Sequence, residues 1–129
     1  MSAPNPGNRP TSPFMLGSLY RWQISSVTST IHRVTGVALF FSFFMLVLWI
    51  VSAAAGGGFF DCMNWLLTSW LGKIALVLSL WGLCYHMLNG IRHLVWDMGY
   101  GFDLDVAAKS GMGVIIGSVV LTIITLICI

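Results

Sequence analysis

The run VALFFSFFMLVLWIVSAAA, Val37 to Ala55, decides the fold class, because it is almost entirely apolar and contains no charged residue. An α-helix needs about 20 such residues to cross the hydrocarbon core of a bilayer. A backbone exposed to lipid must satisfy its own hydrogen bonds, and a helix does so within one segment. The chain has three apolar runs of suitable length, at about residues 31–55, 66–95 and 111–129. The sequence therefore predicts an all-α membrane protein with three transmembrane helices.

The composition agrees with a membrane domain. Of the 129 residues, 57% are hydrophobic and 8% are charged, whereas soluble domains carry about 25% charged residues. The length suits a single domain, and a net charge of +2 gives no indication of a nucleic-acid partner. Cys62, Cys84 and Cys128 lack the spacing of a metal site, so we interpret them as packing residues and expect no disulfide.

The N-terminal part differs in character from the rest of the chain. We expect residues 1–30 to form an arm and an interfacial segment, and residues 31–129 to form the transmembrane domain. The arm is rich in Pro, Ser, Asn and Gly. It lacks the patterns of a signal peptide and of a mitochondrial transit peptide, which favours a bacterial inner membrane over a mitochondrial one.

The distribution of cations predicts the orientation. Five cations precede or open the first apolar run or flank the second loop: Arg9, Arg21, Arg33, Arg92 and Lys109. Lys73 alone lies near the first loop. Because loops rich in Lys and Arg stay on the cytoplasmic side, we expect the N-terminus and the second loop to face the cytoplasm.

Ionisable side chains gather where the second apolar run ends, in YHMLNGIRHLVWD, residues 85–97. His86, Gly90, His93 and Asp97 are spaced at 0, +4, +7 and +11, which places them along one helical face. At ~1.5 Å per residue, His86 lies about 10 Å deeper in the membrane than His93. A polar residue at that depth is a candidate functional residue. His86 can ligate a haem or metal, bond to a neighbouring helix or relay a proton, and the spacing does not choose among these roles.

A second polar set opens the first apolar run, in SSVTSTIHRVTG. Its members share one helical face: Ser29, His32, Arg33 and Gly36. We expect this face at the same membrane surface as Arg92 and His93, so that the two sets can line one pocket. Arg33, Arg92 and His93 suit an anion such as a haem propionate, whereas Ser29 and Arg33 can alternatively bond to a quinone carbonyl. Snorkelling of these side chains to lipid headgroups is the competing explanation.

The number of histidines limits a haem model. His86 and His93 share a face and cannot bind opposite sides of one iron, and we expect His32 to lie too close to the surface to oppose His86. The chain then supplies one axial ligand, and a partner subunit supplies the other. The small residues Gly113 and Gly117, four positions apart, permit close helix packing.

Three blocks together resemble the cytochrome b subunit of succinate dehydrogenase, which is the larger, b556-type membrane anchor of respiratory complex II. They are RPTSPFMLGSLYRW, SSVTSTIHRVTG and HMLNGIRHLVWDMGYG. The second contains the pattern S-x-x-H-R-x-[ST]-G, and the third contains H-x-x-x-G-I-R-H-x-x-x-D. The combination is specific, and the likeness spans nearly the whole chain.

The resemblance implies a fold, cofactors and partners. The three helices would form half of a heterodimeric anchor bundle with a second small membrane-anchor subunit, and the pair would hold one haem b. A flavoprotein subunit and an iron–sulfur subunit would dock on the cytoplasmic or matrix side. The second axial histidine, and a tyrosine that helps to bind ubiquinone, would belong to the partner anchor.

The resemblance also implies residue roles. His86 would be the axial haem ligand, and His32, Arg92 and His93 would contact the haem propionates. Ser29 and Arg33 would line the ubiquinone site. The chain would serve a succinate:ubiquinone oxidoreductase by electron transfer, without a catalytic residue of its own. The residues alone leave two alternatives: a small transporter subunit that moves protons or anions past His86 and Arg33, and a structural anchor without haem.

Overall fold

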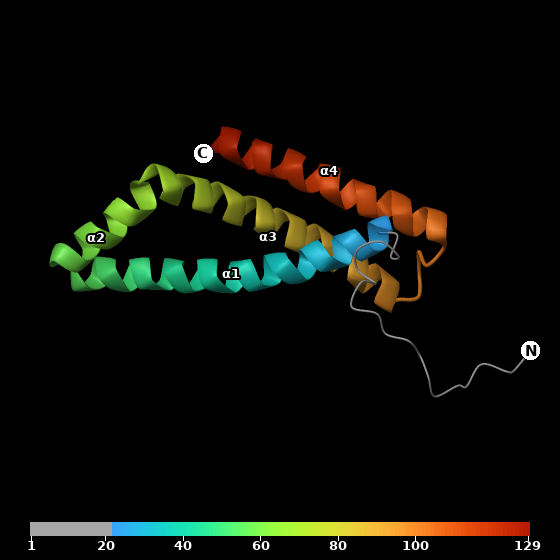
Figure 1. The fold of residues 1–129 in the computed structure, drawn as a ribbon, viewed down its shortest axis with the longest axis horizontal. Helices are drawn as coiled ribbons and strands as arrows, with labels where there is room; N and C mark the ends of the chain where they lie inside the picture. The colour runs from blue at the N-terminus through green and yellow to red at the C-terminus, as the bar shows by residue number, and fades with distance from the viewer. Residues whose placement is uncertain (1–21) are drawn as a thin grey trace, which may run out of the picture.

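The computed structural model describes residues 22–129, and within that range the chain forms four α-helices and no strand. They are α1 (Ile24–Ala55), α2 (Gly57–Thr68), α3 (Trp70–Asp97) and α4 (Leu104–Cys128) (Figure 1). Three of them, α1, α3 and α4, are long and apolar enough to cross a membrane. The predicted all-α fold with three transmembrane helices is confirmed. The expectations for Arg9, Arg21 and the N-terminal arm up to residue 21 lie outside the described residues.

α1 begins earlier than the apolar run predicts, at Ile24 rather than near residue 31. Both threonines of this first part bond back to their own helix: Thr28 Oγ1 donates to the carbonyl of Ser25 at 3.1 Å, and Thr30 Oγ1 donates to the carbonyl of Ser26 at 3.0 Å. A hydroxyl bonded in this way needs no water, so the segment SSVTST can continue the helix. α1 ends at Gly56, whose φ of 68° lies in the left-handed region that favours glycine.

The segment GGGFFDC, which the sequence indicated only as a break, instead contributes to an additional helix. α2 joins the far ends of α1 and α3 (Figure 1). Ser69 then caps α3, because its hydroxyl accepts a hydrogen bond from the backbone N–H of Gly72 at 3.1 Å. The junction is tight, since a Cβ on Gly72 would collide with the carbonyl groups of Leu66 and Leu67. The second spanning helix therefore starts later than its apolar run, whose first residues belong to α2.

The break before α4 is also shorter than the segment GYGFDLDVAAKS predicts. Gly99 and Gly101 turn the chain with φ values of 86° and 80°, and α4 begins at Leu104 rather than near residue 111. Asp105 lies in the first turn, where a carboxylate interacts favourably with the helix dipole. Part of the expected loop therefore belongs to the third spanning helix.

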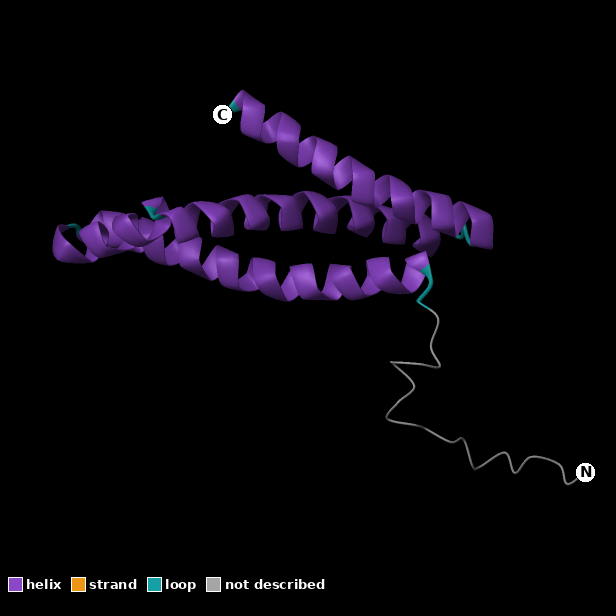
Figure 2. Ribbon diagram, turned by 45° about the horizontal axis from the view of Figure 1, so that its top comes forward, coloured by secondary structure: helices purple, strands orange, loops and turns teal. Residues whose placement is uncertain are grey.

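α3 packs against both other spanning helices (Figures 1 and 2). The three helices lie close together at the end where α1 starts, whereas α4 diverges from α1 and α3 toward its C-terminus (Figure 2). Small and polar side chains occupy most buried positions, and small side chains let helix backbones approach closely. The buried polar and charged residues are Thr28, Thr35, Ser52, Asn89, Arg92, Ser118 and Thr122.

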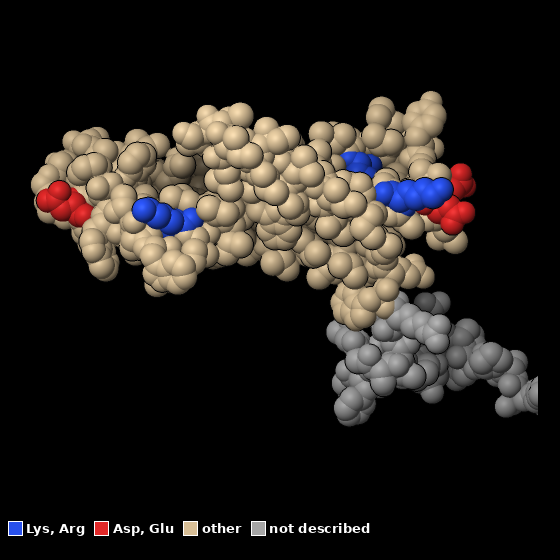
Figure 3. Space-filling view, turned by 90° about the horizontal axis from the view of Figure 1, so that it is seen from above, with Lys and Arg blue, Asp and Glu red and all other residues tan. Residues whose placement is uncertain are grey.

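The surface is apolar where a soluble protein would be polar. Large side chains such as Phe40 and Phe43 are 67% and 68% exposed. The charged side chains seen in Figure 3 lie toward the two ends of the molecule and leave an uncharged band between them. This distribution suits a protein whose middle is surrounded by lipid or by apolar partner helices.

We expect the substitution Gly72→Ala to destabilise the protein, because the new methyl group would meet backbone carbonyls at the α2–α3 junction. Overpacking of this kind costs about 1–3 kcal/mol, and a lower thermal unfolding temperature of the purified protein would report it. Gly58→Ala is the matched control, since a Cβ on Gly58 meets nothing within 4 Å. Equal unfolding temperatures for the two variants would contradict this role for Gly72.

Candidate functional site

The three histidines come together where α1 and α3 face each other. The rings of His32 and His86 stack with centroids 3.9 Å apart and planes inclined by 11°. His93 approaches the other two through His32, at a centroid distance of 5.5 Å. The expectation that His32 lies too close to the surface to oppose His86 is therefore wrong about its depth, because the two rings lie side by side. The physical reason is the early start of α1, which places His32 about two turns inside the helix rather than at its end.

A threonine hydroxyl lies against one nitrogen of the His86 ring. Thr35 Oγ1 donates to the carbonyl of His32 at 3.0 Å, and it also lies 3.4 Å from His86 Nδ1. A hydroxyl that donates to this carbonyl can accept a hydrogen bond from Nδ1, and in that tautomer Nε2 carries the lone pair of the ring. Among residues 22–129, Nε2 has no hydrogen-bond partner.

Two glycines shape the space around this ring. A Cβ on Gly36 would lie 3.1 Å from His86 Cε1, so the glycine lets the imidazole approach α1 closely. A Cβ on Gly90, one turn from His86, would meet nothing within 4 Å. His86 is partly buried. It therefore has one side against α1 and lies beside open space along α3.

A second face of α3 points into the bundle, and sequence reasoning missed most of it. Each of its members directly precedes a member of the face that carries His86 and His93, so the spacing is the same. They are Tyr85, Asn89, Arg92 and Trp96. Tyr85 and Asn89 are fully buried and Arg92 is 6% exposed. The Tyr85 hydroxyl donates to the carbonyl of Thr28 at 2.8 Å, which ties α3 to α1. The repeated 0, +4, +7, +11 spacing was the available signal in the sequence.

Arg92 uses most of its hydrogen-bonding capacity inside the chain. Its Nε donates to Ser110 Oγ at 3.0 Å, and its Nη1 donates to Thr28 Oγ1 at 3.1 Å and to Asn89 Oδ1 at 3.3 Å. Its Nη2 donates to the carbonyl of Ala107 at 2.8 Å. A guanidinium has five N–H donors, so one donor on Nη2 is left. Arg92 therefore has little capacity to bind an external anion.

Ser29 and Arg33 are not part of these networks. Arg33 is exposed and Ser29 is partly buried, one turn apart on α1. Within the described part of the chain, neither side chain has a hydrogen-bond or ion-pair partner. Arg33, Val34, Val37 and Ala38 line a shallow apolar depression of about 420 Å³. A cation, Arg33, thus borders an apolar hollow at the surface of a spanning helix, and Ser29 lies one turn before it on α1.

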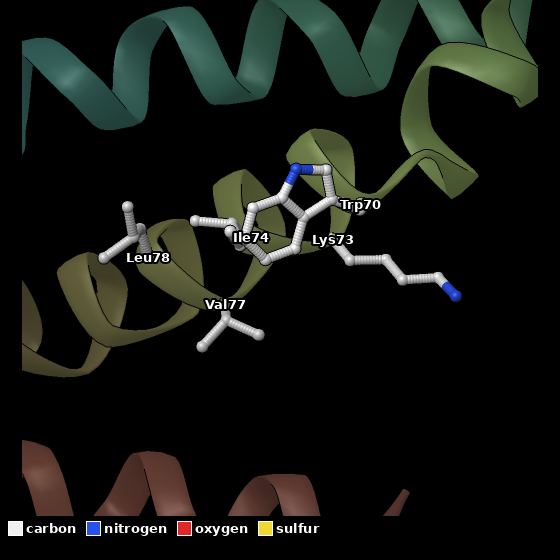
Figure 4. Close-up of a pocket in the computed structure, with 5 residues that line it drawn as sticks. All are labelled: Trp70, Lys73, Ile74, Val77 and Leu78. Carbon is white, nitrogen blue, oxygen red and sulfur yellow. The ribbon is translucent and has the colours of Figure 1, made fainter.

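A second hollow lies at the other end of α3. Its lining consists of Trp70, Lys73, Ile74, Val77 and Leu78, which Figure 4 shows along one stretch of α3. It holds one charged group, Lys73, and none of the three histidines. It is therefore separate from the candidate site.

The side chains by themselves form no metal centre. No group of three or more His, Cys, Asp or Glu residues in the range 22–129 could hold a metal ion. Cys84 is buried, Cys62 and Cys128 are exposed, and all three are free thiols. A metal at His86 would therefore need a carrier that supplies most of its own ligands, as a porphyrin does.

Comparison with known proteins gives a consistent family. The family model described as "Succinate dehydrogenase/Fumarate reductase transmembrane subunit" matches residues 5–125. The succinate dehydrogenase cytochrome b556 subunit of Paracoccus denitrificans is 44% identical over 127 residues, which cover 98% of this chain and 96% of the relative. The cytochrome b556 subunit of Rickettsia prowazekii is 41% identical over 116 residues, which cover 90% and 89% of the two chains.

A mitochondrial relative is also similar. The succinate dehydrogenase cytochrome b560 subunit of Sus scrofa is 34% identical over 113 residues, which cover 84% of this chain and 64% of the relative. The likeness thus extends across bacterial and mitochondrial proteins.

We expect the substitution Tyr85→Phe to weaken the contact between α1 and α3, because it removes the bond to the Thr28 carbonyl. Hydrogen bonds between membrane helices contribute about 0.6 kcal/mol on average and up to about 1.7 kcal/mol. Thermal unfolding of the purified protein measures the loss. Tyr100→Phe, at a residue 70% exposed, is the control. If both variants unfold at the wild-type temperature, the Tyr85 bond is not stabilising.

Proposed function

This chain belongs to the family of succinate dehydrogenase/fumarate reductase transmembrane subunits, and from that premise we propose that it is the cytochrome b membrane anchor of a succinate:ubiquinone oxidoreductase. Its three apolar helices agree with such a role. In the proposed complex, succinate is oxidised in the flavoprotein subunit, and electrons reach ubiquinone at the membrane through the iron–sulfur subunit.

We propose that His86 is the axial ligand to one haem b. The observation that carries this proposal is the placement of its ring: Nδ1 lies 3.4 Å from Thr35 Oγ1, and Nε2 has no hydrogen-bond partner among residues 22–129. A metal-bound histidine typically donates its other ring N–H to a neighbouring oxygen, which fixes the ring and its tautomer. The open space beside Gly90 gives a large flat group room to approach from outside the chain. When bound, haem supplies one-electron redox chemistry at its iron.

The second axial ligand is proposed to come from a second small membrane-anchor subunit. His32 stacks directly on His86 at 3.9 Å, which leaves no room for an iron between the two rings. The exposed apolar surface of α1, α3 and α4 supports a partner of the same kind, with which this chain would form half of a heterodimeric bundle sharing the haem. His32 and His93 are proposed to contact the haem propionates, and Arg92 can add the one N–H that its own contacts leave free.

We place the ubiquinone site at Ser29 and Arg33. Both side chains lack partners in the described part of the chain, and Arg33 borders an apolar hollow that suits a quinone ring. Arg33 would donate to a quinone carbonyl and favour negative charge on that oxygen as electrons arrive, while Ser29 would donate a second hydrogen bond. A tyrosine of the partner anchor is proposed to complete the site.

The location follows from the same premise. The chain is a membrane subunit, and we propose a bacterial inner membrane with the N-terminus on the cytoplasmic side. The bias of Lys and Arg toward the start of α1 and the α3–α4 turn supports this orientation. The flavoprotein and iron–sulfur subunits would then dock on the side where the histidines and Arg33 lie.

We expect His86→Ala to remove the haem from the purified complex without preventing membrane insertion, because the apolar helices are unchanged. The optical spectrum after reduction with dithionite tests this, since a b-type haem gives sharp bands. Met98→Ala, an exposed residue at the end of α3, is the control. Full haem content in the His86 variant would exclude the ligand role, and a wild-type complex without such bands would exclude haem binding.

We expect Arg33→Gln to depress ubiquinone reduction about tenfold or more while succinate oxidation with a soluble dye acceptor stays near normal. The reason is that the dye takes electrons before the membrane site, whereas the quinone loses its charged donor. Lys73→Gln removes a cation from the other end of the helices and serves as the control. An equal loss of both activities would count against a quinone role for Arg33.

A further inference from the structure

Arg92 sits at the point where the three spanning helices meet. Its acceptors come from all of them: Thr28 on α1, Asn89 on α3 itself, and Ser110 and Ala107 on α4. The guanidinium carbon lies 4.0 Å from the centre of the Trp96 ring, which covers one face of the group. All four acceptors are uncharged oxygens, so hydrogen bonds to neutral groups hold the guanidinium, and no counter-ion among the described residues takes part.

The two hydroxyl acceptors are themselves oriented. Thr28 Oγ1 donates its proton to the carbonyl of Ser25, and Ser110 Oγ donates its proton to the carbonyl of Ala107. Each hydroxyl therefore presents a lone pair to Arg92. Gly111 completes the fit, because a Cβ there would lie 3.0 Å from Ile24 Cγ2 and 3.5 Å from Arg92 Nη2.

The same contacts determine how α1 lies along α3. Thr28 is held twice by α3, at its hydroxyl by Arg92 and at its carbonyl by Tyr85. His32 follows Thr28 by one helical turn and stacks on His86. A slide of α1 by one residue would displace His32 by about 1.5 Å, which is enough to disrupt a ring stack of this kind.

We propose that Arg92 is a positioning residue, which joins α1, α3 and α4 through neutral hydrogen bonds and thereby sets how His32 meets the haem-ligating His86. The part of this proposal that concerns haem rests on the proposed function. Arginine is required because its planar fork reaches acceptors on two other helices at once, whereas lysine offers three donors on a single nitrogen.

The test uses the intact membrane complex with Arg92→Lys, Thr28→Val and Ser110→Ala. We expect all three to retain haem but to shift the electron paramagnetic resonance signal of the oxidised haem, which reports the orientation of the axial imidazole. We also expect the half-life of haem loss on warming to shorten roughly threefold to tenfold, as for one lost interhelical bond. Arg92→Lys should have the largest effect, and the two uncharged substitutions should change both readouts in the same direction.

Two controls separate positioning from general effects. Thr30→Val removes an exposed hydroxyl that bonds only to its own helix, at the carbonyl of Ser26. Lys109→Gln removes an exposed cation from α4 at the same end of the molecule. Both should keep the wild-type signal and half-life.

Three outcomes are decisive. If Arg92→Lys shifts the haem signal while Thr28→Val and Ser110→Ala leave it unchanged, Arg92 acts by direct contact with an anion and the positioning role is overturned. If the controls move as much as the test variants, the role is also overturned. If the wild-type complex holds no haem, the proposed function fails. The role of Arg92 in joining the helices is then tested by the unfolding temperature. Arg92→Lys must lower this temperature the most, and both controls must keep the wild-type value.

Discussion

The structure depends on one constraint: lipid offers no hydrogen-bond partner to a polar group, so most buried polar groups of the spanning helices bond inside the protein. Among the described residues, the buried side-chain atoms without a partner are His32 Nδ1 and Asn89 Nδ2. Most buried hydroxyls bond back to their own helices, as Ser118 and Thr122 do on α4. Arg92 donates hydrogen bonds to oxygens on three helices. The consequence is an interior richer in polar groups than the surface, which is the reverse of a soluble domain.

α3 carries two polar faces that differ by one residue in register and therefore by about 100° around the helix. One face points into the bundle, and its tyrosine and arginine hold the helices together. The other holds His86 and His93 at the edge of the bundle, where both remain partly exposed. The structural role and the proposed cofactor-binding role thus fall on different faces of a single helix. The separation explains why the histidines can serve a ligand from outside while the bundle itself stays closed.

Much of the fold could be predicted, because length and apolarity suffice to identify spanning helices. The ends of those helices could not, since they depend on local contacts that hydropathy does not measure. Thr28 extends α1 by bonding to Ser25, and Gly72 allows α2 to pack directly before α3. The depth of His32 was misjudged for the same reason. The spacing of motifs suggested the candidate residues as a single set, whereas their separation into an internal network around Arg92 and an outward-facing group could not be predicted from spacing.

The sequence by itself determined the class of the protein, the number of spanning helices, the family and the candidate residues, because apolar runs and spaced motifs are local properties. Only the tertiary structure decided that His32 stacks on His86, that Thr35 lies against His86 Nδ1, and that Arg92 faces inward. Neighbouring residues on a helix point in directions about 100° apart. Which of them meets a partner therefore depends on how the helices are rotated and aligned against each other, and that alignment results from contacts between residues far apart in the chain.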